Sequence, residues 1–358
     1  MARFGVYVHI PFCASKCDYC AFATWTDRGH LVESYVSALR TEIARAVADA
    51  MPVADTVFVG GGTPTLLPGA DLAAVISAIP VADDAEITVE CNPDDVTVDL
   101  LRTYRDAGVN RVSLGVQSMS THVLSSLGRT HDQRNVDLAV SAIRAAGIPT
   151  FNLDLIYGAV GESIDDWRHT VSAALALDPP HVSAYGLTVE AGTPLASQPD
   201  RHPDDDDQAD KYELVDDLLT DAGLDNYEVS NWARPGHESR HNRLYWDQGD
   251  YRGFGCAAHS HRAGRRWWNL RTPDRYIEAI SRGDTVEASF ETLDADTRRF
   301  ERLELALRTR DGVPADAFTA ETLDLLEGMV RAHPNDPDRV VLTRAGRLMA
   351  NDIATRLR

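Results

Sequence analysis

Short runs of apolar residues alternate, over the first half of the chain, with longer segments in which apolar positions follow a helical period. The short runs are almost continuously hydrophobic, which is typical of strands buried on both faces of a sheet. Turn signals, such as the Ala-Gly pairs at 107–108 and 146–147, close several of the longer segments. We predict strands over residues 5–10, 56–60, 87–91, 112–116, 150–156 and 182–189, and helices over 31–49, 70–78, 97–107, 133–146 and 164–177.

This alternation predicts βαβ units around a parallel sheet, in an α/β fold. A doubly wound sheet and a barrel both fit it. Residues able to bind ligands follow several successive strands, whereas a doubly wound sheet collects them at one crevice, so an open or partial barrel with one functional rim is favoured. Taken singly, each of these residues could also be a loop cap or a turn residue. They are Cys13, residues 60–63, Glu90, Gln117 and Asp154.

The second half of the chain has a different pattern. An acidic run at 204–207 suits the N-terminus of a helix that continues through 211–219, and a strand is expected at 226–230. The Pro-Gly pair at 235–236 is the expected boundary between a core domain, 1–235, and a C-terminal region, 236–358. Within that region, 236–290 is rich in His, Trp and Gly, and 291–358 has the pattern of short helices with one strand at 340–343.

Charge and composition narrow the class of protein. The 358 residues carry 55 acidic and 35 basic side chains, a formal net charge of -20, which disfavours nucleic acid and anionic membranes as partners. No apolar stretch approaches the length of a membrane span, and no signal-peptide core precedes the first strand. We expect a cytoplasmic protein whose contact with membrane-bound partners, if any, is peripheral.

Three of the five cysteines, Cys13, Cys17 and Cys20, have C-x3-C-x2-C spacing. A compact triplet in a reducing compartment indicates metal chemistry rather than disulfides. Three thiolates can hold three irons of a 4Fe-4S cluster and leave the fourth iron open for a sulfonium cofactor. The alternative is a zinc site formed by the same cysteines with His9.

The loop and the YVHIPFC sequence before it resemble the radical-SAM family, and in particular its branch of oxygen-independent coproporphyrinogen III oxidases and HemW-type heme chaperones. The resemblance covers nearly the whole chain. It implies a partial (β/α)6 radical-SAM barrel with a smaller, mostly helical, winged-helix-like end, a 4Fe-4S cluster on the three cysteines, and bound S-adenosylmethionine. It also implies that the S-adenosylmethionine site contains Tyr7, Tyr19, Gly61, Gly62, Thr63, Glu90, Gln117, Arg129 and Asp154.

Three features bear on the choice between oxidase and chaperone. The oxidases usually have a further cysteine two residues after the third, where this chain has Phe22. They also carry an N-terminal arm, which we expect to be lacking here because Tyr7 lies near the start. The HNRLYW segment beginning at His241 resembles the H-N-x-x-Y-W motif of the heme chaperones, which makes His241 a candidate heme ligand. Other ligand types and possible walls of a heme pocket lie nearby: His237, Cys256, His259, His261, Trp232, Trp246, Trp267 and Trp268.

The leading hypothesis is therefore a heme chaperone that binds heme, transfers it to acceptor (respiratory) hemoproteins, and retains the cluster and the S-adenosylmethionine site. The first alternative is a radical-SAM oxidase that decarboxylates coproporphyrinogen III, an activity that Phe22 disfavours; whether the chain is an enzyme stays open. The second alternative is a zinc-stabilised interaction protein.

Overall fold

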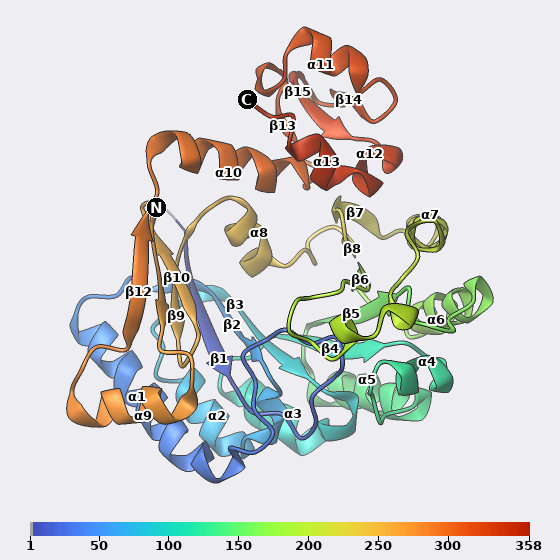
Figure 1. Cartoon of the computed structure of the whole chain (residues 1–358). Coiled ribbons are helices and arrows are strands. Elements are labelled where there is room, and N and C mark those ends of the chain that lie inside the picture. The colour runs from blue at the N-terminus through green and yellow to red at the C-terminus, as the bar shows by residue number, and fades with distance from the viewer. Residues whose placement is uncertain (1–2) are drawn as a thin grey trace.

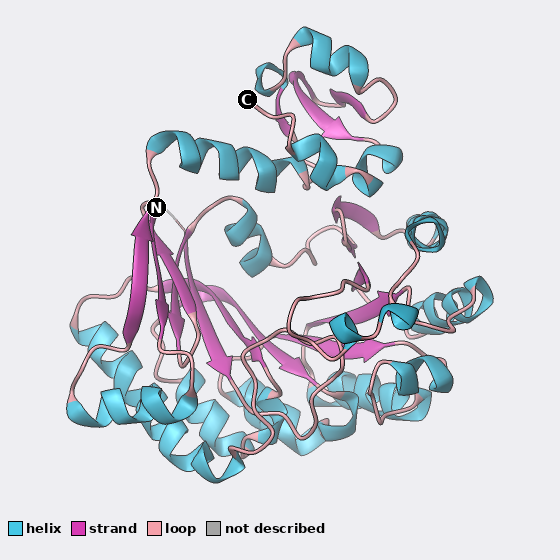
Figure 2. Ribbon diagram, in the orientation of Figure 1, coloured by secondary structure: helices cyan, strands magenta, loops and turns pink. Residues whose placement is uncertain are grey.

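The computed structural model describes residues 3–358, and within them a single twelve-stranded sheet forms the core (Figures 1 and 2). Strands β1 to β6 are parallel and adjacent, and β9 pairs in parallel with the free side of β1. Strands β12 and β7 are the two edges, so the sheet curves into an open, partial barrel. The strands are β1 Phe4–Ile10, β2 Ala54–Gly61, β3 Val81–Cys91, β4 Arg111–Gln117, β5 Thr150–Tyr157, β6 His181–Gly186, β7 Asp225–Glu228, β8 Asn231–Ala233, β9 Asp250–Phe254, β10 His259–Arg262, β11 Arg265–Asn269 and β12 Glu287–Thr292.

Helices cover the outer face of the parallel strands, as Figure 2 shows. Local sequence sets their ends: α5 begins at a capping box between Asp132 and Asn135, and it ends at Gly147, whose φ of 74° is left-handed. The helices of this layer are α1 Val32–Ala48, α2 Gly69–Ile76, α3 Val98–Asp106, α4 Thr121–Ser126, α5 Gln133–Ala146, α6 Ile164–Ala176, α7 Asp205–Asp221 and α9 Pro273–Arg282. Short 3-10 turns are η1 Gly29–Leu31, η2 Pro64–Leu66, η3 Pro93–Asp95, η4 Leu195–Ser197 and η5 Pro199–Arg201.

The parallel strands have different residues on their two faces. On β4 the outward Val112 and Leu114 are buried beneath the helices, whereas the inward Arg111 and Ser113 border the barrel interior. Strands β3, β5 and β6 repeat this alternation, because successive side chains of a strand point to opposite faces. The barrel therefore has an apolar outer layer and a polar inner wall.

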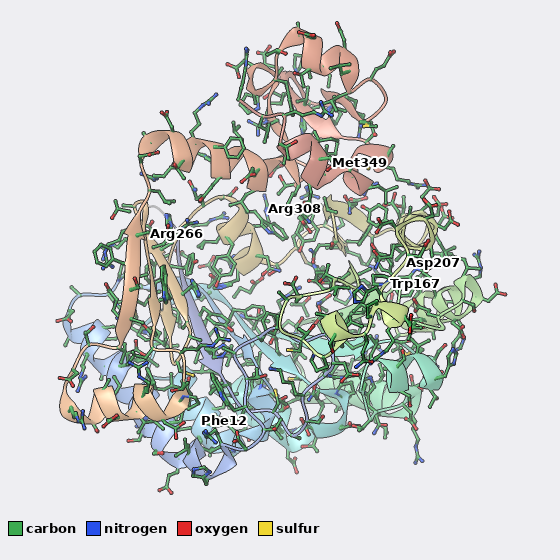
Figure 3. All side chains as sticks on the ribbon, in the orientation of Figure 1. Phe12, Trp167, Asp207, Arg266, Arg308 and Met349 are labelled. Atoms are coloured by element: carbon green, nitrogen blue, oxygen red, sulfur yellow. The ribbon has the colours of Figure 1, made fainter. Side chains whose placement is uncertain are left out.

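A second, smaller core forms the C-terminal end of the chain. It packs three strands and four helices around Leu307, Val313 and Phe318, above the barrel in Figure 1. Arg308, labelled in Figure 3, lies at the end of α10 and pairs with Glu228 of β7 at 3.1 Å. The elements are α10 Ala295–Leu307, β13 Val313–Pro314, η6 Ala315–Ala317, α11 Ala320–Leu325, β14 Val330–His333, β15 Asp336–Leu342, α12 Arg344–Leu348 and α13 Ala350–Ala354.

The predicted fold class is confirmed, and each predicted strand and helix of the first half lies within a few residues of an observed one. The acidic run also begins a helix as predicted, with Asp204 as the N-cap of α7. Sequence analysis did not anticipate β9 to β12, which place residues 250–292 in the barrel sheet on the β1 side. The sheet thus draws on both sides of the expected boundary at 235, and a division into domains at that point stays a prediction.

The helix α8 (Arg240–Trp246) occupies a special position. It lies at the end of the barrel where the parallel strands begin, between the strands and the C-terminal unit (Figure 1). Among residues 3–358, no helix combines the length and apolar character needed to cross a bilayer.

Candidate functional site

The three cysteines of the C-x3-C-x2-C segment lie on one loop that follows β1, beyond Phe12, which Figure 3 labels. Backbone hydrogen bonds fix the two ends of this loop: Cys13 N–H donates to the Trp25 carbonyl at 3.1 Å, and Cys20 N–H donates to the Cys17 carbonyl at 3.2 Å. All three thiols are free and half-buried. The loop thus presents three sulfur donors from a short, anchored segment.

Two side chains from other elements reach these sulfurs. Thr63 Oγ1 lies 3.8 Å from Cys13 Sγ, and Arg129 Nη1 lies 3.7 Å from Cys17 Sγ. Burial raises the pKa of the Cys13 and Cys20 thiols, which disfavours their thiolate forms. Hydrogen-bond donors and positive charges beside the loop act in the opposite direction and favour the thiolates. This donor set fits a 4Fe-4S cluster in which three of the irons would each take one thiolate.

The other two cysteines have separate, buried surroundings. Cys91 Sγ lies 3.7 Å from the Val89 carbonyl oxygen, and Cys256 Sγ lies 3.7 Å from the Tyr35 hydroxyl. Burial raises the pKa of Cys256 to about 12, which keeps it a thiol. Neither supplies an obvious fourth thiolate to the loop.

The glycine turn after β2 lies directly against the cysteine loop. Gly62 N–H donates to the Ile10 carbonyl at 2.7 Å, and Thr63 N–H donates to the Phe12 carbonyl at 2.7 Å. A Cβ on Gly62 would lie 2.5 Å from the Phe12 carbonyl oxygen and 3.1 Å from Cys13 Sγ. Only glycine permits so close an approach, so the turn is shaped by its contact with the loop.

Glu90 on β3 and Asp154 on β5 both line the barrel interior, on either side of β4. Glu90 Oε2 accepts from Gly61 N–H at 3.0 Å, and Asp154 accepts from Ser113 Oγ at 2.8 Å. Burial, followed by the charge of Asp154, raises the pKa of Glu90 to about 7, although the Gly61 bond opposes the shift. Burial also raises the pKa of Asp154. Two carboxyls that resist ionisation together would favour a cationic ligand placed between them.

Gln117 and Arg129 meet at the end of β4. Gln117 has a left-handed φ of 63°, and a Cβ on Gly115 would lie 3.0 Å from Gln117 Nε2 and 3.5 Å from Arg129 Nη2. Arg129 Nη2 donates to Asn92 Oδ1 at 2.8 Å and to the Gly115 carbonyl at 3.1 Å. The structure therefore brings the predicted amide and guanidinium together beside the loop.

The two predicted tyrosines differ in position. The Tyr7 hydroxyl lies 3.0 Å from His9 Nδ1. Burial and then the charge of Glu90 raise the pKa of Tyr7, so the tyrosine lies near that carboxyl. Tyr19 packs against a small apolar cluster that includes Val123 and Leu127, and burial and Cys17 are the first causes of its raised pKa. Both tyrosines therefore flank the loop, one on the barrel side and one on the outer side.

A cavity of about 1050 Å³ occupies the barrel interior. Tyr7, Gly61, Glu90, Asp154 and His241 line it. The other predicted site residues lie outside this lining, around the cysteine loop: Cys13, Cys17, Cys20, Tyr19, Gly62, Thr63, Gln117 and Arg129. The site therefore has two connected parts, a sulfur-rich rim and a large inner chamber.

His241 lies on α8 at the far end of this chamber and is fully buried. Its Nδ1 is 2.8 Å from Thr56 Oγ1, and its Nε2 has no hydrogen-bond partner. Burial lowers its pKa to about 3, so the ring is neutral and Nε2 can carry a lone pair. A buried polar atom without a partner is costly, and its position in a cavity wall suggests a ligand.

The other ligand types of the 236–290 segment are placed differently. Both nitrogens of His261 are engaged, by the Gly249 carbonyl at 2.9 Å and by Gly264 N–H at 3.1 Å. His259 lines the cavity and stacks on Trp268, which is the only one of the four tryptophans considered for the wall that borders the cavity. His237, Cys256, His261, Trp232, Trp246 and Trp267 do not line it.

The zinc alternative requires His9 beside the cysteines. The ring of His9 is already held at both nitrogens, by the Tyr7 hydroxyl at 3.0 Å and by the Ala23 carbonyl at 2.9 Å. Within residues 3–358, no three His, Cys, Asp or Glu side chains are arranged around a single metal position. A zinc site would have to break the bonds of His9, whereas a cluster leaves them in place.

Comparisons with known proteins agree with this geometry. The pattern of the Radical SAM superfamily matches residues 7–174. The heme chaperone HemW of Mycobacterium tuberculosis is 43% identical over 99% of this chain and 94% of its own length. The chain belongs to the HemW family.

Further relatives extend this result. The HemW proteins of Bacillus subtilis and Escherichia coli are 33% and 37% identical, over 98% and 91% of this chain and 97% and 88% of their own lengths. The solved structure of the radical-SAM coproporphyrinogen III oxidase HemN of E. coli superposes with a TM-score of 0.84, at 24% identity, over 99% of this chain and 89% of that one. The HemW family thus shares its fold with the oxidase, and the predicted family and its cofactors, a 4Fe-4S cluster and S-adenosylmethionine, are confirmed.

Sequence analysis missed two polar residues of this HemW-family site. Asn92 holds Arg129, and Arg111 lines the inner chamber. The strand was predicted over 112–116, but counting back in steps of two from Gln117, just after it, reaches 115, 113 and 111, so strand periodicity could have placed Arg111 on the inner wall. It was overlooked because it stands at the beginning of the strand, away from the predicted rim.

Proposed function

We propose that this chain is a heme chaperone, which binds heme in the barrel chamber and passes it to acceptor hemoproteins. The family relationship supports this, since relatives that share 33% and 43% identity over nearly the full chain are named heme chaperone HemW. The chamber volume of about 1050 Å³ is at the upper end of the range for ligand pockets, which suits a tetrapyrrole.

The observation that carries the proposal is the state of His241. Thr56 fixes one ring nitrogen at 2.8 Å, while the other is buried, neutral and without a partner in the chamber wall. Histidine ligands of metals are normally oriented in this way, by a hydrogen bond at the opposite ring nitrogen. A heme iron at Nε2 would satisfy an atom that is otherwise unpaired.

The same proposal assigns the rim to the cluster and S-adenosylmethionine. Cys13, Cys17 and Cys20 would each hold one iron, and the remaining iron would be open to the cofactor. Glu90 and the Gly61 to Thr63 turn suit the ammonium group, Arg129 the carboxylate, and Gln117 and Asp154 the ribose hydroxyls. Tyr7 and Tyr19 would flank the cofactor. When bound, the cluster supplies one low-potential electron to the sulfonium.

Heme titration of the anaerobically reconstituted chain tests the role of His241. His241→Ala should bind heme at least about tenfold more weakly and show a shifted Soret band, because an axial ligand is lost. His122→Ala, which changes a histidine on α4 that is 59% exposed, should match the wild type. Thermal unfolding of the apo variants checks that both are folded. An unchanged affinity and spectrum in His241→Ala would remove His241 from this role.

The oxidase activity of the structural neighbour gives a second assay. Phe22 stands where the oxidases usually have a cysteine, and its side chain is 64% exposed at the chamber wall. We therefore expect no decarboxylation of coproporphyrinogen III under anaerobic conditions with reductant and S-adenosylmethionine. Product formed at an enzymatic rate would replace the chaperone assignment with the oxidase.

The acceptors are proposed to be respiratory hemoproteins, including membrane-bound ones met by peripheral contact. The cytoplasmic location expected from the composition stays a prediction. Pull-down of heme-loaded chain against membranes that contain apo-cytochromes would test the acceptor class, with heme-free chain as the control.

A further inference from the structure

Arg111 is a buried guanidinium at the inner end of the chamber. It stands at the first position of β4, its side chain borders the chamber, and the residue is 2% exposed. Nη1 donates to the His237 carbonyl at 3.1 Å. Within the described chain, this is its one hydrogen bond, and no carboxylate oxygen lies within 4 Å of it. A charge so deep in a protein normally has a partner.

The carboxylates nearest to this end are occupied by other donors. Asp154 accepts from Ser113 and Asn152, both at 2.8 Å. Glu86 accepts from the backbone N–H groups of the first two residues of α8, both at 3.0 Å. Glu228 pairs with an arginine of the C-terminal unit at 3.1 Å. None of the three forms an ion pair with Arg111.

The groups around Arg111 do not pair with its charge directly. His181 lies in the same wall, and burial and then the charge of Arg111 lower its pKa, so the ring is neutral. Its nitrogens are taken by Asn152 at 2.5 Å and Tyr227 at 2.7 Å, so His181 adds no charge beside the guanidinium. Burial raises the pKa of Asp154, and its hydrogen-bond donors and the charge of Arg111 oppose that shift, so Asp154 and Arg111 interact without forming a salt bridge. In a chain of net charge -20, a buried guanidinium without a direct ion pair is an exception that calls for an anionic ligand.

We propose that Arg111 binds a carboxylate of the molecule that occupies the chamber. The inference rests on the proposed function, under which that carboxylate is a propionate of heme. One short segment, residues 237–241, is common to both proposed contacts: its His237 carbonyl accepts from Arg111, and its His241 has the unpartnered nitrogen. Iron at His241 and a propionate at Arg111 would fix the orientation of the tetrapyrrole, since the planar guanidinium can hold a carboxylate through two parallel bonds.

The carboxylate of S-adenosylmethionine is the other possible source of this anion. Arg129 is better placed for that cofactor, since it lies beside Cys17, whereas Arg111 lies at the opposite end of β4. The two sources are separated by measuring both ligands on the same variants.

The test compares heme with heme dimethyl ester, in which both propionates are uncharged. Wild-type chain should bind the ester roughly ten- to a hundredfold more weakly than heme, the effect of a lost charge-assisted hydrogen bond. Arg111→Gln should bind heme about as weakly as the wild type binds the ester, and should no longer distinguish the two. Arg111→Lys keeps the charge and should retain part of the preference for heme over its dimethyl ester. The same comparison can be made with Arg111→Lys if Arg111→Gln does not fold.

Arg102→Gln removes the same charge from an exposed position on α3 and should behave as wild type. Equal binding of heme and ester by wild type, or full discrimination by Arg111→Gln, would overturn the assignment of Arg111. Loss of S-adenosylmethionine binding in Arg111→Gln with unchanged heme binding would assign the carboxylate to that cofactor instead and also overturn it. If the wild-type chain binds heme but binds the dimethyl ester equally well, the proposed function stands and the role of Arg111 falls. If the wild-type chain binds no heme, the proposed function and the role of Arg111 both fall.

Discussion

Single side chains show how the barrel interior departs from an ordinary core. The pKa of Glu90 is raised to about 7 from its usual 4.5, because its carboxyl is buried and is also affected by the charge of Asp154. A raised carboxyl pKa means that the contribution of Glu90 to stability is fully present below pH 4.5 and is lost as the pH rises through about 7. Glu90 also borders the chamber, where water screens part of this effect.

Replacement of Glu90 makes this linkage measurable in the ligand-free chain. Glu90→Gln should match the wild type at about pH 4.5 and exceed its unfolding free energy by about 1–2 kcal/mol above pH 7. Thermal unfolding followed from pH 4.5 to 8 measures the difference. Glu33→Gln, on the exposed face of α1, should show no such trend. A difference in unfolding free energy between wild type and Glu90→Gln that does not change with pH would contradict the raised pKa of Glu90.

At this scale, most of the candidate residues that the structure brings together around the cysteine loop and the chamber had been named from the sequence. Cys13, Gly62 and Gln117 could be predicted because each follows a predicted strand, and parallel strands end at one edge. Tyr19 and Arg129 were expected only from the family resemblance. Arg111 and the exact state of His241 could not be predicted, because whether a polar atom has a partner depends on residues far away in sequence, such as Thr56, 185 positions before His241.

Among the elements, the glycine turn after β2 and the cysteine loop behave as one unit. Their backbones are joined by the Gly62 and Thr63 bonds to the carbonyls of Ile10 and Phe12, both 2.7 Å long. The geometry of the sulfur donors therefore depends on a turn about fifty residues further along the chain.

Gly62→Ala tests this dependence. The new Cβ would lie 2.5 Å from the Phe12 carbonyl oxygen, so the loop has to move. We expect iron and sulfide per chain after anaerobic reconstitution to fall by at least about twofold. The matched control is Gly29→Ala, since no atom lies within 4 Å of a Cβ there. Full cluster content in Gly62→Ala would show that the loop does not depend on the turn.

Strands β9 to β12 were not predicted from the sequence, and one reason applies to all four. These strands are short, and β11 has two arginines followed by two tryptophans, an order without the alternation of a strand, with Arg265 over the Trp267 ring at 5.0 Å. Their pairing is decided by neighbouring strands rather than by their own periodicity. The long parallel strands were predictable because both faces are buried, and the helices because their caps and apolar stripes are local.

For the whole molecule, a buried carboxylate ties the C-terminal unit to the barrel. Asp216 of α7 accepts from Arg344 and Arg347 of α12, both at 2.7 Å, and from Trp232 at 2.9 Å. Burial acts to raise the pKa of Asp216, but these partners outweigh it and lower it. The stabilisation is therefore present above the ordinary pKa of 3.8 and is lost as the pH falls through the lower folded value.

Asp216→Asn should destabilise the chain by about 2 kcal/mol at pH 7, since two guanidinium groups lose their shared anion. Hydrogen exchange of α12 should be faster than in wild type, and the difference should shrink towards pH 3. Asp217→Asn, which removes an exposed partner of Arg344 alone, should have a much smaller effect. Equal protection of α12 in Asp216→Asn and wild type would contradict this role of Asp216.

A heme chaperone must hold heme in the barrel chamber and then give it up to another protein. The most direct measurement mixes anaerobically reconstituted, heme-loaded chain with an excess of an apo-hemoprotein and follows the absorbance of both heme sites. If the chain is a heme chaperone, heme should move to the acceptor at a rate that rises with acceptor concentration. Heme that leaves only at its own dissociation rate, whatever the acceptor and its concentration, would contradict a chaperone.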